Sequence, residues 1–478
     1  MSEAFDAVVV GSGPNGLAAA IELAKNGFSV CVLEAADTIG GGMRTLESTL
    51  PGYRHDECSA VHPLGILSPY FRELPLAEHG LEWVGFDASV AHPLDDGPAV
   101  CLTRGVEETS ADLDPADAAA WERMVRPFLR EPHDLLADLL GPIRLRPRRP
   151  VQMARFGMGA AWPATRYARR KFRGPRAQAL FAGCAAHAVL PLDMLFTAAL
   201  GLVFAVTAHV ETWPCARGGS ASIASALESL LRSLGGVTRC SSPVRRLADV
   251  PDARVILFDL APRPFARIAS DELPTGYVRR LERYVYGPGS FKLDWALEGP
   301  IPWRDSRVNG AATVHVGGTL EEIADSERAA WEGRVHERPY LILCQQSERD
   351  ETRAPAGKHT GYAYCHVPNG CDEDMTERIE AQVERFAPGF RDRILARNAT
   401  GPSGFESLNP NYVGGAVTGG AAHLPQLFTR PVARLNPYTT PNPKLFLCSA
   451  STPPGGGVHG MCGYHAARAA MRRLRRGS

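Results

Sequence analysis

Several features that mark common classes of protein are missing from this chain of 478 residues. Basic and acidic residues each number 52, so no excess of positive charge points to nucleic acid as a partner. The eleven cysteines are scattered, and the closest couple, Cys365 and Cys371, is separated by five residues. No spacing suits a redox dithiol or a zinc site, so we expect no bound metal. Scattered cysteines favour a reducing, cytoplasmic location.

The chain also lacks a hydrophobic run long enough for a membrane span. The most apolar stretch, Met194–Val210, is interrupted by threonines and is shorter than the ~20 residues that a spanning helix needs. It predicts a buried helix that lines an apolar substrate cavity, with a face that dips into a membrane as the alternative. Too few residues precede the first predicted strand for a signal peptide. A G-x-S-x-G elbow is absent as well, which disfavours a hydrolase.

What the chain does contain is a dinucleotide-binding pattern near its start. A strand-like run, Val8–Val10, leads into a glycine turn, an amphipathic helical pattern and a second strand. The positions of the G-x-G-x-x-G pattern are filled by Gly11, Gly13 and Gly16. The first glycine permits the tight turn, the second lets a pyrophosphate approach the backbone, and the third allows close packing of helix on strand. With Pro14 and Asn15, this turn opens a helix whose free N–H groups would hold phosphates.

The residues after this unit decide between dinucleotides. Glu34 ends the second predicted strand, where its carboxylate can accept hydrogen bonds from an adenosine ribose and disfavours the 2′-phosphate of NADP. Ala35 follows, and then comes a second glycine turn with Gly41, Gly42 and Arg44. The pyrophosphate of an extended FAD needs close backbone approach and a fixed positive charge, which Arg44 would supply. The pattern therefore favours FAD as the cofactor, with a surface loop and a solvated arginine as the alternative.

A second ligand-binding pattern lies near the other end of the chain. Leu445–Cys448 is typical of a short buried strand, 453–457 of a glycine turn, and 459–475 of a helix. A helix whose N-terminus faces a ligand stabilises negative charge by roughly 0.3–1 kcal/mol. An ordinary terminal helix with a glycine-rich entry is the alternative.

These two patterns and three longer segments resemble the flavin-dependent amine oxidase and phytoene desaturase superfamily over nearly the whole chain. The segments, which together with RGGSASIASALESLLRSLGG, HVGGTLEEIA and NPNYVGGA look like one phytoene-dehydrogenase-like subgroup, are LPGYRHDECSAVHPLG (50–65), YGPGSFKLDWALEGPIPW (286–303) and PPGGGVHGMCGYHAARA (453–469). The resemblance implies that the C-terminal helix points at the pyrimidine edge of the flavin, with Gly456, Gly457 and Val458 against the isoalloxazine. It also implies that a residue near Val244 touches the adenine through its backbone.

The resemblance and the composition together predict an α/β fold. A Rossmann-like (GR2-type) FAD-binding domain would be interleaved with an α+β substrate domain built on an antiparallel sheet. A strand at Cys240–Leu247 is expected to return the chain to the flavin domain. The predicted FAD-binding domain comprises residues 1–75, 215–263 and 431–478, and the substrate domain comprises 76–214, which is mainly helical, and 264–430.

Histidine suits proton transfer near neutral pH, so His62, His187 and His459 are the candidate catalytic groups beside the flavin. Each has a structural alternative. His62 can hydrogen-bond loop backbone, and His187 lies among alanines, where it can be a satisfied core histidine. His459 starts the C-terminal helix, where it can contact the cofactor or the helix end. The adjacent His55 and Asp56 are expected to be solvated or structural.

The predicted function is that of an FAD-dependent oxidoreductase. It would transfer a hydride between flavin N5 and an apolar, polyene-, terpenoid- or lipid-like substrate, by desaturation or by the reverse ene reduction. An amine-oxidising flavoenzyme is one alternative, and a binding or escort protein on the same fold is another. The retained glycines and acid favour an enzyme over an escort protein.

The sequence gives less information about partners. Only one full dinucleotide fingerprint occurs, so no permanent NAD(P) site is expected. The electron acceptor would be oxygen, a quinone or another carrier. Peripheral contact with a membrane and homodimerisation stay open, and no nucleic acid partner is expected.

Overall fold

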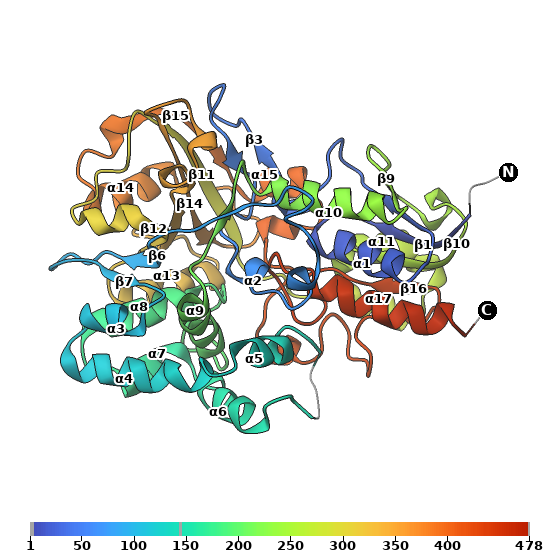
Figure 1. Cartoon of the computed structure of the whole chain (residues 1–478), viewed down its shortest axis with the longest axis horizontal. Helices are drawn as coiled ribbons and strands as arrows, with labels where there is room; N and C mark the ends of the chain where they lie inside the picture. The colour runs from blue at the N-terminus through green and yellow to red at the C-terminus, as the bar shows by residue number, and fades with distance from the viewer. Residues whose placement is uncertain (1–3, 143–145, 477–478) are drawn as a thin grey trace.

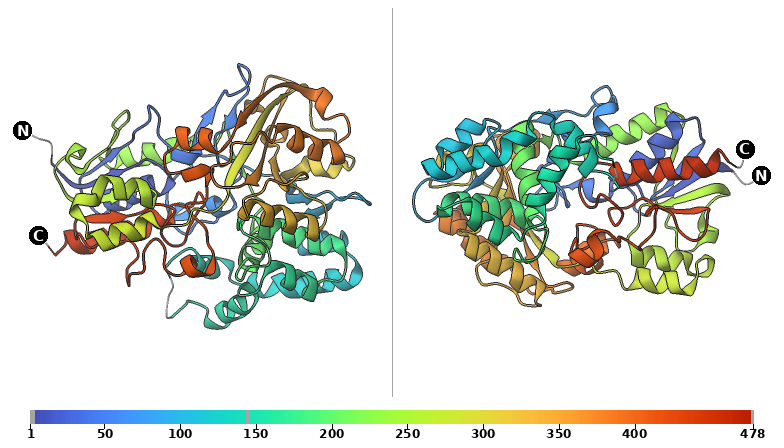
Figure 2. Two further views of the ribbon diagram at one scale, coloured as in Figure 1. Left: turned by 180° about the vertical axis from the view of Figure 1, so that it is seen from behind. Right: turned by 90° about the horizontal axis from the view of Figure 1, so that it is seen from below.

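The computed structural model describes residues 4–142 and 146–476 and contains two bodies that lie side by side (Figure 1). The first, the parallel-sheet body, is built on five parallel strands in the order β16-β10-β1-β2-β9. Both ends of the described chain lie at this body (Figures 1 and 2). Its strands are β1 (Phe5–Val10), β2 (Val30–Leu33), β9 (Val237–Arg239), β10 (Ala253–Phe258) and β16 (Leu445–Leu447).

Helices cover both faces of this sheet. They are α1 (Pro14–Lys25), α10 (Ala221–Ser233), α11 (Pro262–Ala269), α12 (Thr275–Glu282) and α17 (Met461–Leu474). Ala7 and Val9 of β1 pack in one hydrophobic cluster with α1, α10 and α17, whereas Val8 and Val10 pack in another with α11 and α12. An apolar strand that is buried on both faces is typical of the centre of a parallel sheet. The predicted Rossmann-like fold is confirmed.

The second, the mixed-sheet body, is built on seven strands in the order β15-β11-β14-β13-β12-β6-β7. They are β6 (Ala88–His92), β7 (Val100–Leu102), β11 (Gly289–Leu297), β12 (Ala311–Val316), β13 (Leu341–Cys344), β14 (His359–Val367) and β15 (Ile394–Thr400). Their pairing is antiparallel except between β6 and β12, which run parallel. The predicted antiparallel sheet is thus found, extended by two strands from the stretch expected to be mainly helical.

A helical layer packs against this sheet (Figure 1). It comprises α3 (Val106–Ala111), α4 (Pro115–Val125), α5 (Pro132–Leu139), α6 (Pro150–Ala160), α7 (Ala164–Lys171), α8 (Pro175–Ala186), α9 (Ala198–Val210) and α13 (Leu320–Trp331). On the opposite face lies α14 (Thr376–Phe386). The buried helix predicted within Met194–Val210 is α9. No helix in the described chain is long and apolar enough to cross a membrane.

Short elements complete the fold. They include β3 (Thr45–Leu46), β4 (His55–Asp56), β5 (Trp83–Val84), β8 (Cys215–Ala216), α2 (Pro63–Ile66), α15 (Pro402–Leu408), α16 (Leu424–Leu427) and the 3-10 helices η1 (Gly41–Met43), η4 (Leu247–Asp249) and η8 (Glu351–Arg353). The predicted strand at Cys240–Leu247 is wrong, because β9 lies earlier in the chain and Ser241 adopts a φ of +50°, which ends the extended run. The domain boundaries stay a prediction.

Candidate active site

The first glycine turn joins β1 to α1 at the carboxyl edge of the parallel sheet. Gly11 has a φ of +102°, and a Cβ on Gly16 would lie 2.1 Å from the Gly11 carbonyl oxygen, so neither position accepts a side chain. Pro14 lies in the first turn of α1, where its missing N–H costs no hydrogen bond. The Oδ1 atom of Asn15 is buried without a hydrogen-bond partner in the described chain. The turn leaves the N-terminus of α1 able to receive an anion.

Glu34 is fixed beside this turn at the end of β2. Its Oε2 accepts hydrogen bonds from the hydroxyl of Ser12 at 2.5 Å and from the Ser12 N–H at 3.0 Å. Its Oε1 accepts from the Ala36 N–H at 2.9 Å, and Ala35 between them is exposed. The carboxylate is therefore buried at the position predicted to hold a ribose.

The chain that follows β9 returns to the same place. The Ser242 N–H donates to the carbonyl oxygen of Glu34 at 2.8 Å. Val244, two residues further on, is half-buried and packs on the hydrophobic cluster of α11 and α12. Val244 thus lies near the ribose acid, although its contact with adenine stays a prediction.

The second glycine turn touches the first. A Cβ on Gly41 would lie 3.0 Å from the Cα of Gly13, and a Cβ on Gly42 would lie 2.3 Å from the hydroxyl of Tyr412. Arg44 follows, with Nη2 3.5 Å from Glu34 Oε1. The two turns and the arginine that sequence reasoning assigned to one cofactor therefore lie together.

Acidic side chains contact Arg44 but do not use all of its hydrogen-bond donors. Its Nη2 donates to the carbonyl oxygen of Thr38 at 3.2 Å, and its Nη1 lies 3.9 Å from Glu57 Oε1. The buried Nε of Arg44 and both carboxylate oxygens of Glu57 have no hydrogen-bond partner in the described chain. Burial raises the pKa of Glu57, which the Arg44 guanidinium partly offsets. These groups have spare capacity to bind a polar ligand.

The C-terminal loop approaches the same region through α2. A Cβ on Gly65 in α2 would lie 3.0 Å from the Val458 carbonyl oxygen, so α2 packs against the loop at 456–459. Val458 is half-buried and Gly457 is exposed. His459 is fully buried, and its Nδ1 accepts from the Met461 N–H at 3.0 Å, at the start of α17. The sequence interpretation of His459 as a contact at the helix end agrees with this bond.

The residues present fit an FAD molecule. Glycine turns give backbone access at the N-terminus of α1, and Arg44 offers a guanidinium for the pyrophosphate. Glu34 offers a carboxylate for the ribose. Several buried polar atoms that have no hydrogen-bond partner among the described residues belong to this region: Asn15 Oδ1, Arg44 Nε, Glu57 Oε1 and Oε2, Ser451 Oγ and His459 Nε2. A large polar cofactor would satisfy atoms of this kind.

His62 is the residue that precedes α2, and like His459 it is buried. The Ser220 hydroxyl gives its hydrogen to the Ser59 carbonyl at 2.5 Å, so the His62 Nε2, 2.9 Å from Ser220 Oγ, carries the proton. Burial lowers the pKa of His62 to about 4, and burial likewise lowers the pKa of His459 to about 4. Both imidazoles are therefore neutral at pH 7.

His187 belongs to a different place, the helical layer of the mixed-sheet body. It follows α8, and its Nε2 lies 2.9 Å from the Nε2 of His315 on β12. The rings of Phe204 and Trp213 contact it at 4.7 and 6.1 Å between centroids. Burial lowers the pKa of His187 to about 3, with a smaller contribution from His366. The structure brings His62 and His459 to α2 but does not bring His187 to them.

A buried charged network lies between the bodies, and sequence reasoning missed it. Lys292 on β11 is 2 % exposed, and its Nζ donates to Asp294 Oδ2 at 2.8 Å and to the carbonyl oxygen of Asp56 at 2.7 Å. Its ammonium also lies 4.6 Å from the ring centroid of Tyr362. Residues 292 and 294 alternate with apolar ones on one strand, and that alternation was the available signal.

Arg353 in η8 completes this network. Its Nη1 lies 2.8 Å from Asp56 Oδ2, its Nε lies 2.7 Å from Asp350 Oδ2, and all three side chains are fully buried. Burial alone would raise the pKa of Asp56, but Arg353 and the Ser220 N–H hold it below its ordinary value. The expectation that Asp56 and His55 are solvated is wrong, and the structural alternative is right, because both are buried.

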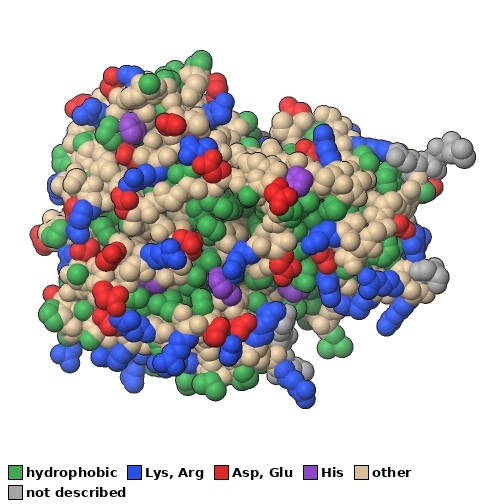
Figure 3. Space-filling view, in the orientation of Figure 1, with side chains coloured by type: hydrophobic (Ala, Val, Ile, Leu, Met, Phe, Trp, Pro, Cys, Tyr) green, Lys and Arg blue, Asp and Glu red, His purple; other side chains and the backbone are tan. Residues whose placement is uncertain are grey.

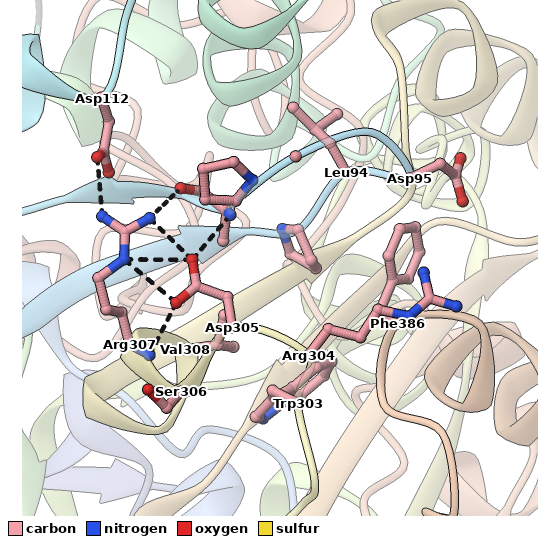
Figure 4. A pocket seen from close by; sticks show the side chains of 14 residues that line it. Leu94, Asp95, Asp112, Trp303, Arg304, Asp305, Ser306, Arg307, Val308 and Phe386 are labelled. Carbon is pink, nitrogen blue, oxygen red and sulfur yellow. Dashed lines mark hydrogen bonds and ion pairs between the residues drawn. The ribbon is translucent and has the colours of Figure 1, made fainter.

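A separate cleft of about 650 Å³ lies at the outer edge of the mixed sheet (Figure 4). Its Arg307 donates to Asp305 and to Asp112, each at 2.8 Å (Figure 4). These charges satisfy one another. The unsatisfied polar atoms and the glycine turns lie elsewhere, so this cleft is not the candidate site.

Comparison with known proteins agrees with this geometry. Residues 9–74 match the NAD(P)-binding Rossmann-like domain family. The chain is 25% identical to the rat pyridine nucleotide-disulfide oxidoreductase domain-containing protein 2, over 98% of this chain and 94% of the relative. It is 28% identical to the hydroxyneurosporene desaturase of Cereibacter sphaeroides, over 97% of each chain.

Solved structures share the whole fold. An oxidoreductase from Methanosarcina mazei superposes with a TM-score of 0.67 at 16% identity, covering 98% of this chain and 99% of that one. Putrescine oxidase bound to putrescine superposes with a TM-score of 0.63 at 17% identity, covering 100% and 99%. Together with the paired glycine turns and the ribose acid, these likenesses confirm the predicted resemblance and the cofactor. The chain is thus similar to FAD-dependent oxidoreductases that include the carotenoid desaturases, and it shares its fold with the flavin amine oxidases.

Proposed function

We propose that the chain uses FAD to transfer a hydride to or from an apolar substrate, by desaturation or by the reverse ene reduction. The observation that supports this most directly is an apolar wall beside α2. Leu64 of α2 packs against both large hydrophobic clusters, that of the parallel sheet and that of the helical layer. The adjoining α9 adds half-buried Leu200 and Val203 to the second cluster. In Figure 3 hydrophobic side chains gather between the two bodies.

The chain's own residues would bind and orient the reactants. FAD, when bound, accepts or donates a hydride at N5. In this proposal the α1 N-terminus and Arg44 hold the pyrophosphate, Glu34 holds the ribose, and residues 456–458 lie against the ring. His62 and His459 act as neutral hydrogen-bonding groups at pH 7. Proton transfer by His62, His187 or His459 stays a prediction.

The charge arrangement favours an apolar substrate over an amine. A cationic amine binds well to a carboxylate that has no other partner. In the network between the bodies, Asp56 and Asp350 are engaged by Arg353, and Asp294 is engaged by Lys292. Asp56 and Asp350 therefore have little capacity left for a cation. Glu57, whose oxygens lack hydrogen-bond partners in the described chain, lies 3.9 Å from the Arg44 guanidinium, whose charge opposes a second cation.

Anaerobic reduction of the bound flavin tests this proposal. The protein is mixed with a panel of apolar polyenes and lipids and with a panel of primary and secondary amines, and bleaching of the flavin absorbance is followed. We expect bleaching by an apolar compound, or reoxidation of the pre-reduced flavin by an apolar alkene, and no response to amines. Bleaching by amines alone would contradict it. Readmission of oxygen or a quinone then identifies the electron acceptor.

An exposed apolar patch on the helical layer suggests how apolar substrates arrive. Val151 and Met158, one face of α6, are 84% and 69% exposed. Trp162 and Leu195 are exposed nearby, where the Ala198 N–H bonds the Trp162 carbonyl. The guanidinium of Arg170 lies 5.6 Å from the Trp162 ring. An apolar face edged by arginines suits the interface of an anionic membrane, so we infer peripheral contact there.

Vesicle sedimentation tests the membrane contact. The protein should sediment with vesicles that contain anionic lipid and much less with neutral ones. Met158→Glu should reduce sedimentation several-fold, whereas Leu408→Glu, at an exposed leucine of α15 in the mixed-sheet body, should not. If both variants sediment with the vesicles as much as the original protein does, this surface is not the membrane contact.

A further inference from the structure

An acid lies inside the predicted pyrophosphate site. Asp259 follows β10, the strand beside β1, and its N–H donates to the Val10 carbonyl at 2.8 Å. This places its side chain at the glycine turn. Its Oδ2 accepts a hydrogen bond from the Gly16 N–H at 2.8 Å, and a Cβ on Gly13 would lie 2.6 Å from the same oxygen. The carboxylate therefore uses an N–H group at the start of α1, where a phosphate would bind.

Among the described residues, no cation forms an ion pair with Asp259. Arg44, the guanidinium predicted for the pyrophosphate, contacts Glu34, Glu57 and the Thr38 carbonyl instead. In a flavin-bound site, the acid would face two phosphate charges as well. Like charges that lie close together repel strongly when they are partly shielded from water.

The groups that face Asp259 come from each element around it. The end of β2 contributes Glu34, whose carboxylate raises the pKa of Asp259. Cys448, after β16, and Cys462, on α17, are buried thiols whose pKa values are raised, so both are neutral at pH 7. Burial is the main cause that raises the pKa of Asp259, to about 7, against the lowering effect of the Gly16 N–H.

We propose that Asp259 takes up a proton from solvent when FAD binds, so that a neutral carboxyl group adjoins the pyrophosphate and cofactor affinity is linked to pH. The proton removes the repulsion and supplies a hydrogen-bond donor where the carboxylate was only an acceptor. This inference rests on the proposed position of the pyrophosphate at the first glycine turn. Its expected sign follows from linkage: raising the pH above 7 deprotonates Asp259 in the free protein and weakens FAD binding, by up to tenfold per pH unit.

Calorimetric titration of the flavin-free protein with FAD measures the proton directly. At pH 8, titrations in two buffers that differ in ionisation enthalpy should report uptake that approaches one proton per FAD, and at pH 5.5 almost none. Asp259→Asn should bind FAD with an affinity that hardly changes between pH 5.5 and 8.5, without this proton uptake. Asp249→Asn, which removes an exposed acid of η4, should behave as the original protein.

Three results would overturn the inference. The first is tight FAD binding by the original protein without proton uptake at pH 8, which leaves the proposed function intact. The second is an Asp259→Asn variant that keeps the full pH dependence. The third is an original protein that binds no FAD at any pH, which overturns the proposed function as well. If the variant does not fold, the two-buffer titration of the original protein still decides.

Discussion

The two bodies of this molecule position their functional groups by different means. In the parallel-sheet body, Gly16 lies against Gly11, five residues earlier, and the backbone itself forms the site. In the mixed-sheet body, His187 meets His315 across 128 residues, and at its border Asp56 meets Arg353 across 297. A site made by neighbours in the chain depends on residue size at fixed spacings. A site made by distant side chains depends on the whole fold.

The difference also shows in what each region tolerates. The glycine turns have no room for a Cβ, so substitutions in the parallel-sheet body should disrupt its site by steric clash. The buried pairs hold charges and neutral imidazoles away from water, so the mixed-sheet body should fail through unpaired charge or protonation.

The largest effect on cofactor binding is expected in the parallel-sheet body. Gly16→Ala puts a Cβ 2.1 Å from the Gly11 carbonyl, and the turn must open to accept it. FAD affinity should fall by about ten- to 100-fold, because overpacking of this kind costs roughly 1–3 kcal/mol. Gly157→Ala in α6 meets no atom within 4 Å and should leave FAD binding unchanged. FAD affinity is measured by fluorescence titration. Equal affinity in the two variants would contradict the claim that the glycine turn has no room for a Cβ.

The largest effect on stability is expected in the buried ion network. Arg353→Met leaves Asp56 and Asp350 buried without their cation and should lower the free energy of unfolding by about 3–5 kcal/mol. Arg307→Met removes a guanidinium that is 45% exposed and should cost less than about 1 kcal/mol. Urea unfolding of both variants measures the difference. Similar losses would mean that burial does not set the cost.

Low pH should lower the stability of the fold through its buried histidines. Burial lowers the pKa of His92 to about 4, so the unfolded chain, with a pKa near 6.5, binds more protons than the folded one between those values. Stability present above pH 6.5 is therefore lost as the pH falls, by about 1 kcal/mol per such histidine between pH 6.5 and 5.5. His92→Gln should remove this share of the acid dependence. If the slope of unfolding free energy against pH is unchanged in this variant, His92 does not contribute to the loss of stability in acid.

The smallest effect is expected at Val244. Because its predicted contact with adenine is through the backbone, Val244→Ala should change FAD affinity less than about threefold. Glu34→Ala removes the ribose acid and should weaken binding about ten- to 100-fold. A large loss in Val244→Ala would show that the side chain holds the adenine.

The sequence allowed the parallel-sheet body to be predicted well because its signals are local. The first two strands, α1, β16 and the start of α17 lie within a few residues of their expected positions. The exception is the segment after β9, which was expected to form a strand. Val244 instead lies in irregular chain after the turn at Ser241, and Leu247 begins η4, although both pack on the hydrophobic cluster of α11 and α12.

The mixed-sheet body was less predictable, for physical reasons. β6 and β7 are short and are separated by Pro93 and Pro98, and only β6 pairs with β12, which lies far along the chain. His55 and Asp56 look like loop residues in sequence, and only the arrival of Lys292 and Arg353 makes their burial favourable. Likewise, nothing near His187 in the chain indicates His315.

The most direct test of the account is the visible absorption spectrum of the purified protein, followed by identification of any flavin released on denaturation. We expect the protein to show the absorption bands of an oxidised flavin and to release FAD, either directly after purification or after incubation with FAD. A colourless protein that also fails to take up added FAD would contradict it and would favour a binding protein on the same fold.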